Sequence, residues 1–327
     1  MQVRNWKRLY GCGALNWDSF YEIESLDLLK HCCPDVSPGS ELVFEESKFS
    51  ELREVLNKKG LFIYECGGGS AANTIYALSS WGFETGFVGA VGEDPYGERI
   101  LKELNSKGVD TTFICKKGAT SRAIIVIDKN KDRFIAVCPG NAESYLSMDS
   151  IKEHGELRES YFHLSSFASD SGINFQLELL RWIDKKCSFD PGEVYCRKGR
   201  SFCEKWFPWV EVLFLTEEET ALLKMKEEEF FDLGMCYVFL KMGSKGAKVF
   251  TQNEEIFLPS FPVEIHVDNT GAGDYFNAGV IAGLKLGLPV EAALRLGTFC
   301  ASQSLKSYGR SGCISYKEFK NYLNLLK

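Results

Sequence analysis

A string of small residues near the end of the chain reads Asp268-Asn269-Thr270-Gly271-Ala272-Gly273-Asp274, and the apolar residues 275–284 follow it directly. The apolar run predicts a buried helix that begins at the glycines. The first turn of such a helix exposes unpaired N–H groups and the positive end of the helix dipole, which together attract anions. A carboxylate beside that anion site, here Asp274, is suited to take a proton from the attacking hydroxyl of a phosphoryl transfer.

A structural alternative for Asp274 is a first-turn carboxylate that only stabilises the helix dipole. The flanking Gly271 and Gly273 favour the anion site, because a Cβ at either position would crowd a bound phosphate. Competing motifs are missing from the sequence: it has no Gly-Lys pair of a Walker-type loop, no Gly-x-Ser-x-Gly elbow, and no histidines at metal-ligand spacing. His163 stands in an apolar run, so we predict a hydrogen-bonded core residue there.

Short apolar runs alternate with helical patterns along the chain. This alternation is typical of βαβ crossovers and predicts an α/β fold, a mostly parallel sheet sandwiched by helices. The strand candidates are residues 9–15, 87–91, 161–165, 212–215 and 237–242. The helix candidates between them are residues 72–81, 96–107, 174–186 and 217–226.

Two pairs of alternating segments interrupt this order. Residues 123–128 and 133–137 flank a polar tip and predict an antiparallel hairpin that projects from the main sheet. We expect it to belong to a small β lid formed by about residues 15–30 and 112–141, within a single domain of residues 1–327. A second hairpin is expected at 247–251 and 255–259, and one amphipathic helix at 45–58.

Bulk composition restricts the class of protein. The 327 residues are 45% apolar and 25% charged with a net charge of −7, as in an ordinary globular protein that has no broad nucleic-acid surface. No segment approaches membrane-spanning length and the N-terminus has no apolar signal core, so we expect a cytoplasmic protein without membrane contacts. The twelve cysteines contain no Cys-x-x-Cys and are expected to be mostly buried free thiols.

The segment 268–274, together with a second motif upstream, resembles the signatures of the ribokinase-like, or PfkB-type, carbohydrate and nucleoside kinases. The second motif is Gly68-Gly69-Ser70-Ala71-Ala72-Asn73, which continues through residues 77–82 to Val88-Gly89-Ala90-Val91-Gly92-Glu93-Asp94-Pro95-Tyr96-Gly97. The resemblance runs from residue 11 to about residue 312. It implies a ribokinase-like fold, in which Asp274 is the catalytic base and Gly271, Ala272 and Gly273 form the anion hole for the transferred phosphoryl group.

The resemblance also implies where the acceptor binds. The diglycine Gly68-Gly69 and the side chain of Asn73 hold substrate hydroxyls in the family. Asn16 and Asp18 end the first strand region, and Asp18 resembles the family's aspartate that accepts two sugar hydroxyls, although a simple turn is the alternative. Asn141 resembles the residue that returns from the lid and is a further substrate-binding candidate.

A nucleotide site is implied by the segment 241–247, in which Lys241, Gly243, Ser244 and Gly246 would contact ATP. A surface turn between strands is the alternative. Thr270 is a further ATP-binding candidate.

The same resemblance implies two cation sites. Glu219 resembles the family's glutamate that orders Mg²⁺ through water, but Thr216 stands where the family has an asparagine, so Mg²⁺ positioning is in question. Mere first-turn charges are the alternative for the acidic residues 217–219. Asp268 resembles part of a monovalent-cation loop, which implies activation by K⁺.

The implied reaction transfers the γ-phosphoryl group of ATP to a hydroxymethyl group of a sugar. A nucleoside is the alternative acceptor, because residues 45–73 are more similar to the adenosine-kinase branch, and Phe167 is a candidate for stacking on a base or for a core contact. A non-catalytic protein that binds a nucleotide or sugar and regulates a partner is a third alternative, suggested by Thr216. Exposed lid edges favour a homodimer through the lid.

Overall fold

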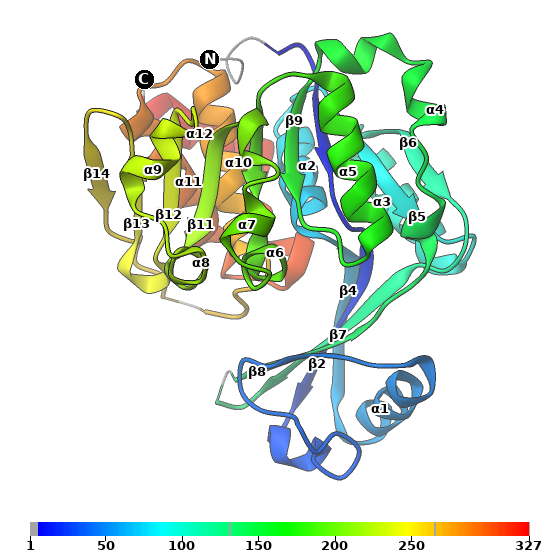
Figure 1. The fold of residues 1–327 in the computed structure, drawn as a ribbon. Helices are drawn as coiled ribbons and strands as arrows, with labels where there is room; N and C mark the ends of the chain where they lie inside the picture. The colour runs from blue at the N-terminus through cyan, green and yellow to red at the C-terminus, as the bar shows by residue number, and fades with distance from the viewer. Residues whose placement is uncertain (1–5, 131, 265, 327) are drawn as a thin grey trace.

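The computed structural model describes residues 6–326 except 131 and 265. Its larger part is a nine-stranded sheet in the order β14-β13-β12-β11-β10-β9-β1-β5-β6 (Figure 1). From β11 and β12 through to β6 every pairing is parallel, and β13 and β14 add an antiparallel edge. The strands are β1 Leu9–Cys12, β5 Thr85–Val91, β6 Asp110–Lys116, β9 Tyr161–Ser165, β10 Cys187–Asp190, β11 Val210–Thr216, β12 Tyr237–Lys241, β13 Ala247–Phe250 and β14 Glu255–Leu258.

Helices cover both faces of this sheet (Figure 1). One buried apolar cluster joins the sheet to α2, α3, α10, α11 and α12, and a second cluster joins the other face to α4, α5 and the short helices α6 to α9. The helices are α1 Glu46–Lys59, α2 Ser70–Ser80, α3 Pro95–Ser106, α4 Asp149–Lys152, α5 Asp170–Ile183, α6 Gly192–Cys196, α7 Arg200–Cys203, α8 Glu217–Leu223, α9 Glu227–Asp232, α10 Ala272–Lys285, α11 Val290–Ser304 and α12 Tyr316–Leu325. The predicted α/β sandwich is confirmed, because strands buried on both faces need a helical layer on each.

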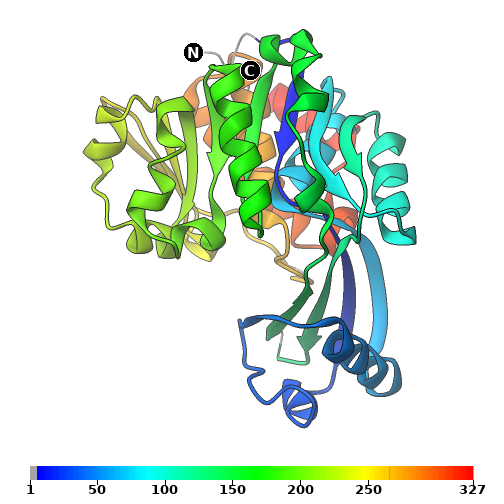
Figure 2. The same ribbon diagram turned by 45° about the vertical axis from the view of Figure 1, so that its right-hand side comes forward.

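A second, five-stranded sheet projects from one edge of the larger part, in the order β3-β8-β7-β2-β4 (Figure 2). We call it the small sheet. Its strands are β2 Asn16–Ile23, β3 Glu41–Val43, β4 Leu61–Gly68, β7 Ser121–Asp128 and β8 Arg133–Cys138. One of its faces packs against α1 through a buried cluster that includes Phe49, Leu52 and Leu56.

The small sheet differs from the lid ranges expected from the sequence. Both predicted hairpins exist, since β7 pairs antiparallel with β8 and β13 pairs antiparallel with β14. However, β6 belongs to the nine-stranded sheet, so the residues from 112 to 116 lie outside the small sheet. The small sheet also takes in β3 and β4, which the sequence ranges omitted because β3 is only three residues long and β4 pairs with β2 across a gap of some forty residues.

Two other expectations can be compared with the structure. All twelve cysteines lie in the described part of the chain and are free thiols, eight of them buried. Among the described residues, no helix combines the length and apolar character needed to cross a membrane.

Candidate active site

The start of α10 lies at the carboxyl-end edge of the nine-stranded sheet. Gly271 caps the helix with a φ of 80°, a left-handed conformation that glycine adopts without strain. Ala272, Gly273 and Asp274 form the first turn, in which the N–H of Ala272 donates to the carbonyl oxygen of Asn269 at 3.2 Å and those of Gly273 and Asp274 have no partner within the helix. The four residues that the sequence assigned to the anion hole and base are therefore together at a helix N-terminus, where an anionic group is stabilised.

The carboxylate of Asp274 is half-buried and is held by two donors from α2. Ser70 Oγ donates to Oδ1 at 2.7 Å, and Asn73 Nδ2 donates to Oδ2 at 2.8 Å. Burial raises the pKa of Asp274 to about 6, although these two hydrogen bonds lower it. A carboxylate with a pKa close to the operating pH is suited to act as a general base.

Asp18 and Asn16 lie beside each other on β2, at the end nearest the larger part of the molecule. Asn16 Nδ2 donates to Asp18 Oδ1. Gly68 on β4 pairs with Asn16, and a Cβ at Gly68 would stand 2.1 Å from Asp18 Oδ2. Gly69 has a φ of 104°, and its Cβ would stand 2.1 Å from the carbonyl oxygen of Ala14. The diglycine is therefore required by the close approach of β2, and it brings Asp18 next to the helix that carries Asn73.

Burial raises the pKa of Asp18 to about 7, with Arg310 and Asn16 lowering it and Asp268 and Asp274 raising it. Asp18 Oδ2 lies against Gly68, and Ser70, two residues further along the chain, donates to Asp274, so the two carboxylates lie on the same side of this turn although they are 256 positions apart in the sequence.

Asn141 does not share these contacts among the described residues. Its Oδ1 accepts a hydrogen bond from the N–H of Ala119 at 2.7 Å, and the residue is exposed. A substrate role for Asn141 stays a prediction.

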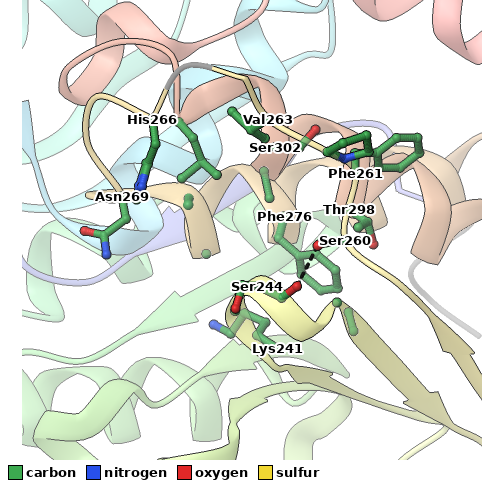
Figure 3. A pocket seen from close by; sticks show the side chains of 18 residues that line it. Lys241, Ser244, Ser260, Phe261, Val263, His266, Asn269, Phe276, Thr298 and Ser302 are labelled. Atoms are coloured by element: carbon green, nitrogen blue, oxygen red, sulfur yellow. Dashed lines mark hydrogen bonds between the residues drawn. The ribbon is translucent and has the colours of Figure 1, made fainter.

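A cavity of about 570 Å³ lies on the other side of the helix start (Figure 3). Ala272 and Gly273 form part of its wall, so the anion site opens into it. The predicted nucleotide residues that line it are Lys241, Gly243, Ser244 and Gly246. Phe261 and Phe276 provide apolar surface. A cavity of this size and lining fits a nucleotide-sized ligand.

Lys241 lies next to Gly273, at the predicted anion site. Its Nζ would be 3.4 Å from a Cβ at Gly273, and it donates to Asp190 Oδ2 at 2.6 Å. Asn277 Nδ2 donates to the same oxygen at 2.6 Å. Burial disfavours the charged form of Lys241, but the negative charges of Asp190 and Glu219 outweigh this effect and raise the pKa of the lysine. A permanent positive charge is thus held at the place where phosphate would approach Gly273.

Glu219 and Thr216 cap α8. Thr216 Oγ1 accepts from the N–H of Glu219 at 3.1 Å, and Glu219 Oε2 accepts from the N–H of Thr216 at 2.8 Å. Burial raises the pKa of Glu219 to about 7, with Lys241 lowering it. In the described part of the chain, no group of three or more His, Cys, Asp or Glu side chains is arranged to hold a metal ion. The donor set fits Mg²⁺ only as an ion carried by phosphates and water, with Glu219 as an outer carboxylate.

Asp268 and Thr270 form a turn just before α10. Asp268 is buried, and its Oδ1 accepts from the N–H and the hydroxyl of Thr270 at 3.0 and 2.8 Å. Thr270 Oγ1 also accepts from Arg133 Nη1 at 3.3 Å, and Asn269 Oδ1 accepts from the same nitrogen at 3.0 Å. Asn269, which belongs to this turn, lines the 570 Å³ cavity. Arg133 on β8 therefore connects the small sheet to the anion loop.

The sequence reasoning missed several of these residues. Ser70 was inside a quoted motif but had no role, and Asp190 was not among the candidate residues. Arg133, Asn277 and Arg310 carried no motif signal, because their partners are distant in the chain. Phe167 is fully buried, so of its two alternatives the core contact holds and stacking on a base does not. His163 is the predicted core residue, with Nδ1 3.0 Å from Ser188 Oγ.

A glycine-lined helix start on a mostly parallel α/β sheet, with a buried lysine and a carboxylate beside it, is an arrangement suited to phosphoryl transfer. The family model for the pfkB family carbohydrate kinases matches residues 45–316. The chain belongs to this family, and it is a kinase whose acceptor is an alcohol.

Individual relatives agree with this assignment. The chain is 31% identical over 255 residues to an ATP-dependent ribose-1-phosphate kinase of Halopiger xanaduensis, an alignment that covers 77% of this chain and 83% of the relative. The structure of adenosine kinase from Sinorhizobium meliloti has a TM-score of 0.82 at 19% identity, covering 97% of this chain and 98% of that one. A putative ribokinase II from E. coli in complex with ATP and Mg²⁺ has a TM-score of 0.73 at 20% identity, covering 98% and 99%. These two structures share the fold.

Proposed function

We propose that the protein transfers the γ-phosphoryl group of ATP to a hydroxymethyl group of a sugar, with Asp274 as the general base. The observation that carries the proposal is the position of Asp274. Its carboxylate is half-buried between the cavity wall at Gly273 and the acceptor-side residues Asn73 and Asp18. Asp274 directly follows Ala272 and Gly273, the two residues by which the start of α10 lines this cavity.

The nucleotide occupies the cavity with its terminal phosphates at the start of α10. The N–H groups of Gly271, Ala272 and Gly273 stabilise the negative charge that develops on the transferred group, and the Lys241 ammonium lies below them. Asp18, Asn16 and Asn73 hold acceptor hydroxyls, with the backbone of Gly68 and Gly69 beside them. Asp274 removes the proton of the attacking hydroxyl, an assistance worth roughly 10²–10⁴-fold in rate.

Mg²⁺ is the proposed companion of ATP, as in the E. coli structure. When bound, it neutralises phosphate charge and orients the phosphates. Glu219 would order its water shell, and the hydroxyl of Thr216 stands in for the usual asparagine. K⁺ activation is proposed at the Asp268 turn; equal rates in sodium and potassium buffers would count against it.

The test is a panel of sugars, sugar phosphates and nucleosides with ATP and Mg²⁺, read by ADP release. We expect rapid ADP release with one sugar class and only slow release without an acceptor, because the small sheet is expected to act as a lid that excludes water. Nucleotide binding without turnover over the whole panel would refute the kinase and favour the regulatory alternative. The ribose-1-phosphate kinase relative makes phosphorylated sugars a necessary part of the panel.

A nucleoside acceptor is the second candidate, and one observation favours it. The small-sheet face that carries Asp18 continues outward into an apolar cluster in which Phe20, Ala123 and Ile125 are buried and Val137 is half-buried. The half-buried apolar residues at the border of this cluster, beyond a hydroxyl-binding carboxylate, suit a base attached to ribose. Faster ADP release with adenosine than with any free sugar would select this acceptor.

A homodimer through the small sheet is also proposed. The edge strands β3 and β4 carry exposed apolar side chains, namely Val43, Leu61 and Phe62, which are 74%, 61% and 49% exposed. Pairing of such edges between two copies would cover them. Light scattering on the purified protein and on a Leu61→Lys variant tests this, and a wild-type monomer would refute it. The cytoplasmic location and the single-domain organisation stay predictions.

A further inference from the structure

Arg310, in the short turn after α11, is the most deeply buried arginine near the site. Its side chain is 1% exposed. Neither Nη1 nor Nη2 has a hydrogen-bond partner among the described residues, and the ion pair from Nη1 to Glu103 Oε2 is long, at 3.4 Å. A buried guanidinium with unsatisfied donors adds little to stability. A contribution to stability therefore does not explain an arginine at this place.

The guanidinium joins three elements behind the active site. Its Nε donates to Asn73 Oδ1 at 3.1 Å, and its Cζ lies 5.0 Å from the centre of the Tyr76 ring, both on α2. Glu103 on α3 also accepts from the N–H of Gly67 at 2.7 Å. A Cβ at Gly67 would be 2.4 Å from Arg310 Nη1, so the space for this side chain depends on a glycine at the end of β4.

The bond to Asn73 decides which way its amide points. Arginine can only donate, so the Asn73 atom that faces Nε must be the oxygen. The Nδ2 group is thereby directed at Asp274 Oδ2, 2.8 Å away. If the amide turned over, Nδ2 would oppose the Nε donor and the oxygen would oppose a carboxylate. Arg310 thus fixes the direction of the Asn73 Nδ2 group, which orients the carboxylate of Asp274, without contacting Asp274 itself.

Arg310 also lies close to Asp18, because Nη1 packs against Gly67 and Asp18 Oδ2 packs against the next residue, Gly68. Its positive charge is the leading one that offsets the burial of Asp18. Removing it would make the ionised form of Asp18 harder to maintain at neutral pH. The other groups that face Asp18 are Asn16, which favours the ionised form, and Asp268 and Asp274, which oppose it. Asp274 is faced by Asp190 from β10 and Lys241 from β12.

We infer that Arg310 is a positioning residue for phosphoryl transfer: through Asn73 it orients the carboxylate of Asp274, and its charge supports the acceptor-binding carboxylate of Asp18. The inference rests on the proposed function for its kinetic consequences, but the orientation of Asn73 can be measured without turnover.

The test variant is Arg310→Met combined with Glu103→Gln, which removes the arginine without leaving an unpaired buried carboxylate. Glu103→Gln alone is the control, because it breaks the same ion pair but keeps the Arg310–Asn73 bond. Arg310→Lys keeps the positive charge but loses the planar Nε donor. All four proteins are compared by thermal unfolding and by kcat and KM for ATP and acceptor from pH 5 to 9.

We expect kcat of the double variant to fall at least about tenfold, with KM for ATP unchanged. The acid limb of kcat/KM for the acceptor should move up by about one pH unit, and Arg310→Lys should restore the limb but not kcat. Glu103→Gln should behave like the wild type. A double variant with wild-type kcat and acid limb, or a Glu103→Gln variant that reproduces its losses, would show that Arg310 is only structural.

Selective ¹⁵N-asparagine labelling gives the measurement that needs no turnover. The side-chain amide peaks of Asn73, identified by their loss in Asn73→Ser, should titrate with Asp274 near pH 6 in the wild type and in Glu103→Gln. In the double variant this titration should shrink or vanish, and its persistence would overturn the inference. A wild type that phosphorylates no acceptor would refute the proposed function alone, and the amide titration would still decide the role of Arg310.

Discussion

Replacing Asp274 by asparagine separates catalysis from folding, because the hydrogen bonds around it can be kept. Ser70 Oγ can accept as well as donate, so the new amide nitrogen can face Ser70 while the amide oxygen still accepts from Asn73 Nδ2. The side chain keeps its volume and its place in the first turn of α10. What it loses is the ability to take a proton.

The substitution should lower the rate of phosphoryl transfer and raise the stability of the fold. Loss of a general base lowers kcat by at least about 10²-fold, with acceptor and ATP affinity little changed. The pKa of Asp274 is raised to about 6 from 3.8, so its ionised form destabilises the fold above pH 6, and the penalty disappears as pH falls toward 3.8. Allowing for partial exposure, this penalty is on the order of 2 kcal/mol, which Asp274→Asn removes.

The assay therefore measures kcat by ADP release and unfolding temperature between pH 4 and 8. At pH 7.5 the variant should unfold a few degrees higher than the wild type, and the difference should close by about pH 4. Asp170→Asn, an exposed first-turn carboxylate of α5, is the matched control and should retain kcat. Near-normal turnover of Asp274→Asn would reject Asp274 as the base, and a variant less stable than the wild type at pH 7.5 would reject the electrostatic argument.

Three further substitutions test other parts of the site. Gly68→Ala places a Cβ 2.1 Å from Asp18 Oδ2. The KM for the acceptor should therefore rise at least about tenfold while the KM for ATP stays unchanged. An equal rise in the two KM values would contradict this. Thr216→Val removes the side-chain cap of α8 and should lower the free energy of unfolding by about 1 kcal/mol. Thr216→Asn keeps the cap and should lower the Mg²⁺ concentration that gives the half-maximal rate. An unchanged Mg²⁺ dependence would refute the magnesium role. Burial lowers the pKa of His163 to about 4, with Asp190 and Lys241 as the facing charges. The contribution of His163 to stability should therefore decline as pH falls from about 6.5 to 4, so the free energy of unfolding of the wild type should fall relative to that of His163→Gln over this range; parallel pH profiles would refute it.

Much of the fold was predictable because its signals are local. The runs at 161–165 and 237–242 are apolar on successive residues, which indicates strands buried on both faces, and they are strands β9 and β12. The helix start at Gly271 was predictable for the same reason, since glycine conformation and apolar periodicity lie within a few residues of each other. The extent of the small sheet was not, because β4 joins it only through pairing with β2, and β3 is three residues long.

The sequence by itself determined the α/β class and the glycine-lined helix start with a carboxylate in its first turn, since each depends on residues adjacent in the chain. Only the tertiary structure decided what surrounds that carboxylate: the Asn73 amide fixed by Arg310, the Lys241 ammonium held by Asp190, and the nearness of Asp18. These contacts join residues 51 to 256 positions apart. No local pattern records such pairings, because they form only when the sheet order and the packing of α2 against α10 bring the elements together.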